Sequence, residues 1–61
     1  MQSFDEVLAS TLTATERHLY FRHIECAHSL DTLIDEFQTT LGDLSMAWLR
    51  IENKLRQAFR P

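Results

Sequence analysis

Three histidines and one cysteine lie close together in the middle of this 61-residue chain, at His18, His23, Cys26 and His28. Imidazole and thiolate groups are ligands that zinc prefers. On a helix, which turns by about 100° per residue, His23 and Cys26 lie within about 60° of each other. The other two histidines each point about 140° away from His23, on opposite sides. The spacing places only two ligands on one face, so we expect no metal site.

Cys26 and a group of carboxylates are the remaining candidates for catalysis. A nucleophilic cysteine needs a pKa lowered by a helix N-terminus or a nearby base. The pattern instead places Cys26 inside a helix on its apolar side, where a free cysteine acts as a small hydrophobe. Acid–base catalysis by Asp31, Asp35 and Glu36 would need a pocket that separates their pKa values. We expect these carboxylates to pair with basic residues instead. We expect no catalytic residue, no cofactor and no enzymatic activity.

Apolar residues recur at alternating steps of three and four along the second half of the chain. This spacing averages 3.5 residues and keeps one stripe of a helix against a partner helix. The pattern predicts an all-α fold in which helix packing dominates. The stripe consists of Ala27, Leu30, Ile34, Phe37, Leu41, Leu44, Trp48, Ile51, Leu55 and Ala58.

Two capping signals place the first helices of a single domain over residues 1–61. Ser3 with Glu6, and then Thr13 with Glu16, have the spacing of a capping box, in which a hydroxyl accepts from a free helix N–H group. They predict a short helix over about 4–12 and a long helix over about 14–41.

Gly42 determines how the longer segments are arranged, and two arrangements fit the pattern. A turn at Gly42, with Asp43 capping a last helix over about 43–60, gives an antiparallel helical hairpin. A continuous helix through the glycine costs only about 1 kcal/mol relative to alanine. It would give an antiparallel coiled-coil or bundle oligomer of long helices with the same contacts. We prefer the hairpin, because glycine and aspartate supply a stop and a start signal.

The charges of the two segments are complementary in this hairpin register. Asp35 would lie beside Arg50, and Asp31 beside Lys54. Exposed ion pairs contribute about 0.2–1 kcal/mol each. They therefore select the antiparallel orientation more than they stabilise it.

Length, cysteine count and charge restrict the setting of the protein. A chain of 61 residues buries only about 60% of its unfolded surface on folding alone. One cysteine cannot form an internal disulfide, so we expect association to add stability. A net charge of -3 disfavours attraction to nucleic acid or to an anionic membrane. No apolar run approaches the roughly 20 residues of a membrane span. The lone cysteine and the acidic start predict a cytoplasmic protein without a secretory leader.

Two interpretations fit the apolar residues beyond those that one hairpin can cover. The short first helix, with Phe4, Val7, Leu8 and Leu12, folds over one apolar face, or the residues form an interaction surface, since exposed apolar patches mark interfaces. We predict a non-enzymatic helical protein–protein interaction module, such as an adaptor, small chaperone, assembly subunit or regulator. It would form a homo-oligomer, either a dimer or a four-helix bundle, or bind a partner protein. The expected core and interaction residues are Leu30, Ile34, Phe37, Leu41, Leu44, Met46, Trp48, Leu49, Ile51, Leu55 and Phe59.

The basic last segment indicates an alternative function, a small dimeric nucleic-acid-associated transcriptional regulator or a modulator of a DNA-binding protein. Arg56 projects about 120° away from Arg50 and about 160° away from Lys54, so the four basic residues of this segment do not form one stripe. Arg56 and Arg60 are the candidate nucleic-acid contacts, brought together by dimerisation.

Overall fold

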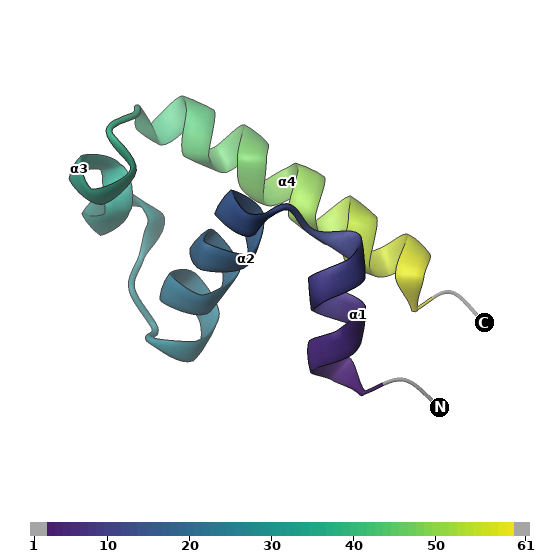
Figure 1. Ribbon diagram of the computed structural model, residues 1–61. Coiled ribbons are helices and arrows are strands. Elements are labelled where there is room, and N and C mark those ends of the chain that lie inside the picture. Colours follow the sequence, from purple (N-terminus) through teal and green to yellow (C-terminus); the bar gives the residue numbers. More distant parts are fainter. Residues whose placement is uncertain (1–2, 60–61) are drawn as a thin grey trace.

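The computed structural model describes residues 3–59, and every regular element in that range is helical (Figure 1). This confirms the predicted all-α class. The elements are α1 (Phe4–Thr11), α2 (Ala14–Tyr20), the π-helical turn η1 (Phe21–Glu25), the 3-10 turn η2 (Leu30–Leu33), α3 (Ile34–Phe37) and α4 (Leu41–Ala58).

The two predicted caps are present at the starts of α1 and α2. The backbone N–H of Glu6 donates to Ser3 Oγ at 3.2 Å. At α2 the box is complete, because Glu16 N–H donates to Thr13 Oγ1 at 3.2 Å and Thr13 N–H donates to Glu16 Oε1 at 2.9 Å. Leu12 and Thr13 are extended and separate the two helices, as expected.

The single helix expected over about 14–41 is wrong, because the chain leaves the helical path twice. The first break follows the π-helical turn, where Cys26 N–H donates to the Phe21 carbonyl oxygen at 3.0 Å. Ala27 then has a φ of 58°, which ends the helix. Ser29 is extended and starts η2, where the Thr32 N–H donates to its carbonyl oxygen at 3.1 Å.

The second break lies at Gln38–Thr40, and the expected turn at Gly42 is therefore misplaced. Gln38 adopts the left-handed conformation with φ 50° and ψ 53°, and its N–H donates to the Asp35 carbonyl oxygen. Thr40 caps α4 by accepting from the Asp43 N–H at 3.2 Å. Gly42 consequently lies inside the first turn of α4. A threonine hydroxyl provides the cap that we expected from Asp43.

α4 is the central element of the fold, and it contacts α1, α2 and η2. In Figure 1 it runs along the top of the molecule, with α1 and α2 below it. The buried core consists of Leu8, Leu12, Leu19, Leu33, Leu44 and Ile51. The last helix is thus covered by several short elements.

The expected pairing of Asp31 with Lys54 is replaced by a different contact. Lys54 Nζ lies 2.6 Å from Glu16 Oε1, which ties α4 to α2. Among residues 3–59, no helix is both long enough and apolar enough to cross a membrane.

Candidate interaction surface

The outward face of α4 carries the two most exposed large apolar side chains of the described chain. Met46 is 55% exposed and Leu49 is 53% exposed. At about 100° per residue they point roughly 140–160° away from the fully buried Ile51. They are three residues apart and therefore neighbours on the helix surface. We call this pair the α4 outer face.

Polar and basic side chains extend this face toward the end of α4. Arg50 follows Met46 by one turn, Asn53 follows Leu49 by one turn, and Arg56 lies a further turn along; all three are exposed. The surface therefore changes from apolar in the first half of α4 to basic in the second half. The other expected nucleic-acid contact, Arg60, lies outside the described residues.

The segment before α4 presents this helix in a helix-turn-helix arrangement. η2 and α3 together form a helical segment, Leu30–Phe37, and the turn Gln38–Thr40 connects it to α4. In DNA-binding proteins with this order of elements, the second helix lies in the major groove. Ser29, at the N-cap position of η2, and Thr40, whose hydroxyl caps α4, are the signals in the sequence from which this arrangement could have been found.

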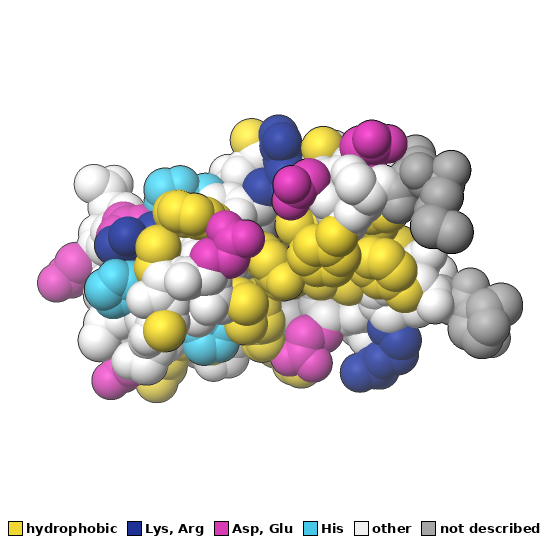
Figure 2. Space-filling model, turned by 90° about the horizontal axis from the view of Figure 1, so that it is seen from below, with side chains coloured by type: hydrophobic (Ala, Val, Ile, Leu, Met, Phe, Trp, Pro, Cys, Tyr) yellow, Lys and Arg dark blue, Asp and Glu magenta, His cyan; other side chains and the backbone are white. Residues whose placement is uncertain are grey.

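A row of aromatic rings joins α1, α2, η1 and α4 on another side of the molecule. The rings of Phe59 and Phe4 stack with centroids 5.5 Å apart, and Phe4 lies 6.0 Å from Tyr20. Tyr20 stacks on Trp48 at 6.1 Å, and His23 meets the Trp48 ring edgewise at 4.6 Å. On the face seen in Figure 2, hydrophobic side chains gather where α1 and the last turns of α4 lie.

The aromatic row changes the interpretation of Trp48 and Phe59. Trp48 is half-buried and packs against the core, and Phe59 is exposed but covered on one side by Phe4. The sequence indicated the first helix, with Phe4, as a cover for such residues, but it did not indicate the individual ring pairs, because no spacing rule links residues on separate elements.

The other expected core and interaction residues fall into three groups. Leu44 and Ile51 are buried, as the stripe predicts. Four are partly buried against the core, namely Leu30, Ile34, Phe37 and Leu55. Leu41 belongs to the stripe but is exposed.

The histidines and Cys26 are used in separate contacts. His18 Nε2 donates to Glu36 Oε2 at 2.8 Å. His23 Nδ1 donates to the His28 carbonyl oxygen at 2.7 Å, which closes the loop after η1. Cys26 is a half-buried free thiol. Within residues 3–59, no three His, Cys, Asp or Glu side chains are grouped as metal ligands.

Glu36 joins α3 to the α2 and η1 segment through two basic side chains. Besides His18, the Arg22 guanidinium lies 3.0 Å from Glu36 Oε1. The hydrogen bond from His18, followed by that from Arg22, lowers the pKa of Glu36 below its usual value. The other carboxylates considered for catalysis, Asp31 and Asp35, are exposed.

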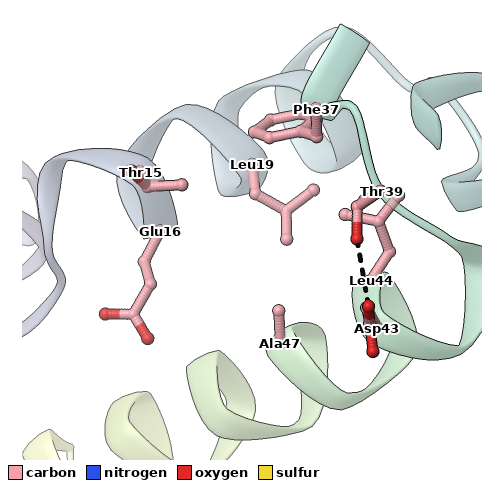
Figure 3. Close-up of a pocket in the computed structure, with 8 residues that line it drawn as sticks. All are labelled: Thr15, Glu16, Leu19, Phe37, Thr39, Asp43, Leu44 and Ala47. Atoms are coloured by element: carbon pink, nitrogen blue, oxygen red, sulfur yellow. Dashed lines mark hydrogen bonds between the residues drawn. The ribbon is translucent and has the colours of Figure 1, made fainter. Parts of the chain in front are cut away.

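A cavity of about 210 Å³ lies between α2, the turn before α4 and the first half of α4. Figure 3 shows its lining, which consists of Thr15, Glu16, Leu19, Phe37, Thr39, Asp43, Leu44 and Ala47. The Glu16 side chain is only 14% exposed. Burial raises its pKa, but the hydrogen bonds from Lys54 and Thr13 outweigh this effect and lower it overall. Glu16 is therefore held as a carboxylate.

No family model, no curated protein and no solved structure matches this chain. The fold and the surfaces described above define a small all-α domain that presents one face of its longest helix.

Proposed function

We propose that the protein is a non-enzymatic interaction module that binds another protein chain through the α4 outer face. The observation that carries this proposal is the exposure of Met46 and Leu49 side by side on the outward side of α4. Exposed apolar side chains that are contiguous mark interaction sites, whereas single ones are ordinary. Methionine also suits such a surface, because its flexible thioether adapts to a partner.

The bound chain in this proposal is a second copy of the protein or a different protein. Two copies that pack their α4 outer faces against each other in antiparallel orientation would form a symmetric dimer. The free thiol of Cys26 fits a reducing compartment such as the cytoplasm.

Light scattering across a dilution series tests self-association of the wild-type chain. The double variant Met46→Gln, Leu49→Gln should shift the molar mass to that of a monomer while the helical circular dichroism is kept. The matched control is Phe21→Gln, Ile24→Gln, which changes an equally spaced pair of exposed apolar residues on η1. The control should associate like the wild type.

If the wild-type chain is monomeric at every concentration, the same variants are used to search for a different partner protein. Capture of a protein by the wild type and the control, but not by the α4 double variant, would then support the proposal. Equal behaviour of all three forms in both experiments would contradict it.

The helix-turn-helix arrangement favours a second candidate, a small nucleic-acid-binding regulator that places α4 in the major groove. Arg50, Asn53 and Arg56 are exposed on α4, with Asn53 between the two arginines, which project about 120° apart. The net charge of -3 opposes this function, because phosphate contacts supply most of the affinity for DNA.

Fluorescence anisotropy with duplex DNA separates the two candidates. DNA binding should weaken steeply as salt rises and should be lost in the double variant Arg50→Gln, Arg56→Gln. Arg17→Gln, a change of an exposed arginine on α2, is the control. Absence of binding at low salt would remove this second candidate.

A further inference from the structure

The cavity beside α4 combines an apolar floor with an acidic rim. Leu19 from α2 and Ala47 from α4 lie between the two acidic residues, and the Phe37 ring lies at one edge (Figure 3). Glu16 from α2 and Asp43 from α4 stand on different walls. A hydrocarbon chain that ends in a cation matches both parts of this lining.

One of these carboxylates, Glu16, already binds a primary ammonium group of the protein itself. The primary ammonium of Lys54 donates to Glu16 Oε1 at 2.6 Å, and Thr13 N–H donates to the same oxygen at 2.9 Å. Glu16 therefore has one oxygen, Oε2, that takes part in neither bond.

Asp43 carries a charge that no basic group balances in the described part of the chain. Its Oδ2 accepts only a long hydrogen bond, 3.4 Å, from the Thr39 hydroxyl. The three ion pairs found among residues 3–59 involve Glu16 and Glu36 and do not include Asp43. A carboxylate at the edge of apolar surface gains most from a cation that also covers that surface.

We infer that this cavity binds a primary alkylammonium group. The ammonium pairs with Asp43, and its hydrocarbon chain covers Ala47 and Leu19 in the direction of Glu16. A lysine side chain of another protein and a free aliphatic diamine share this chemistry. The site is separate from the α4 outer face and does not depend on the function proposed above.

Titration of ¹⁵N-labelled protein with n-butylammonium chloride, followed by NMR, tests the inference. Amide signals of cavity residues such as Thr15, Leu19 and Ala47 should shift and saturate, with a dissociation constant on the order of 1–10 mM for so small a ligand. The matched ligand is 1-butanol, which has the same chain without charge and should bind about tenfold more weakly.

Protein variants locate the binding. Asp43→Asn should weaken n-butylammonium binding about tenfold, whereas Asp31→Asn, a change of an exposed acid outside the cavity, should leave it unchanged. Ala47→Leu fills the apolar floor of the cavity and should abolish n-butylammonium binding. This variant tests the inference if the Asp43 variant fails to fold. Circular dichroism checks the fold of each variant.

The probes also distinguish the two sources of the ammonium group. Tighter binding of a short lysine-containing peptide than of n-butylammonium assigns the site to a protein side chain, and tighter binding of 1,4-diaminobutane assigns it to a free amine. The inference is overturned if the shifts do not saturate, if 1-butanol binds equally well, or if both cavity variants bind like the wild type.

Discussion

Among residues 3–59, two residues other than glycine adopt a positive φ, Ala27 at 58° and Gln38 at 50°. This conformation costs an L-residue roughly 1–2 kcal/mol, because its Cβ approaches the neighbouring carbonyl oxygen. Both residues end helical segments, the positions where glycine is most often found. The fold therefore places ordinary residues where its turns favour glycine.

Ala27→Gly should raise the free energy of unfolding by about 0.5–1 kcal/mol, because the relief of strain exceeds the extra entropy that glycine loses on folding. Ala9→Gly makes the same chemical change on an exposed position inside α1. It should lower the free energy of unfolding by about 1 kcal/mol. Urea unfolding followed by circular dichroism measures both. Equal destabilisation by the two variants would show that the loop after η1 does not hold Ala27 in this conformation.

At the scale of elements, Glu16 links two helices. Its side chain completes the capping box of α2 and also takes the Lys54 ammonium of α4, so one carboxylate serves a helix end and a helix contact. Its pKa lies below the ordinary value of 4.5. A carboxylate with a lower pKa in the folded state stabilises the fold above the unfolded pKa and loses this contribution as the pH falls.

The melting temperature should therefore be nearly constant at neutral pH and fall as the pH drops through 4.5 and below. Glu16→Gln should lower the stability at pH 7 by about 1 kcal/mol and should also flatten the acid side of the profile. Glu25→Gln, at an exposed position of η1, should leave both unchanged. Thermal melts between pH 3 and pH 7 provide the measurement. A Glu16→Gln profile parallel to that of the wild type would contradict this role.

The helix starts could be predicted from sequence where their signals lie within four residues. Ser3 and Thr13 cap the helices that they were expected to cap, because the cap contacts are local. The breaks after Glu25 and Phe37 could not be predicted in this way. The apolar stripe continues through both, while the turns depend on positive φ values at Ala27 and Gln38, residues that do not signal a turn.

At the scale of the whole molecule, the apolar stripe predicted which residues of α4 are buried in the core. It did not predict which residues of the other elements pack against them. Leu44 and Ile51 are buried where the periodicity of α4 places them. Their neighbours come from α1, α2 and η2, and sequence spacing does not specify which elements will meet. The cavity lined by Glu16 and Asp43 could not be predicted for the same reason.

Core and surface positions of α4 should differ sharply in their effect on stability. Ile51 is fully buried, so Ile51→Ala should cost about 2–5 kcal/mol, and the milder Ile51→Val about 0.5–1.5 kcal/mol. Leu49→Ala, two residues earlier and 53% exposed, should change the stability of the monomer by no more than about 0.5 kcal/mol. Urea unfolding at low protein concentration compares them. A large loss in Leu49→Ala would show that this side chain supports the fold.

The stacked rings of Phe4 and Phe59 bring the first turn of α1 and the end of α4 together. Two residues that are far apart in the sequence therefore lie close together in space. A linker could join Phe4 to Phe59, and its length is not critical, because the entropic cost of loop closure rises only slowly with loop length. New ends could then be opened in the loop between η1 and η2, where Ala27 and His28 are exposed. The protein is thus suited to circular permutation, which would place α4 in the middle of the chain.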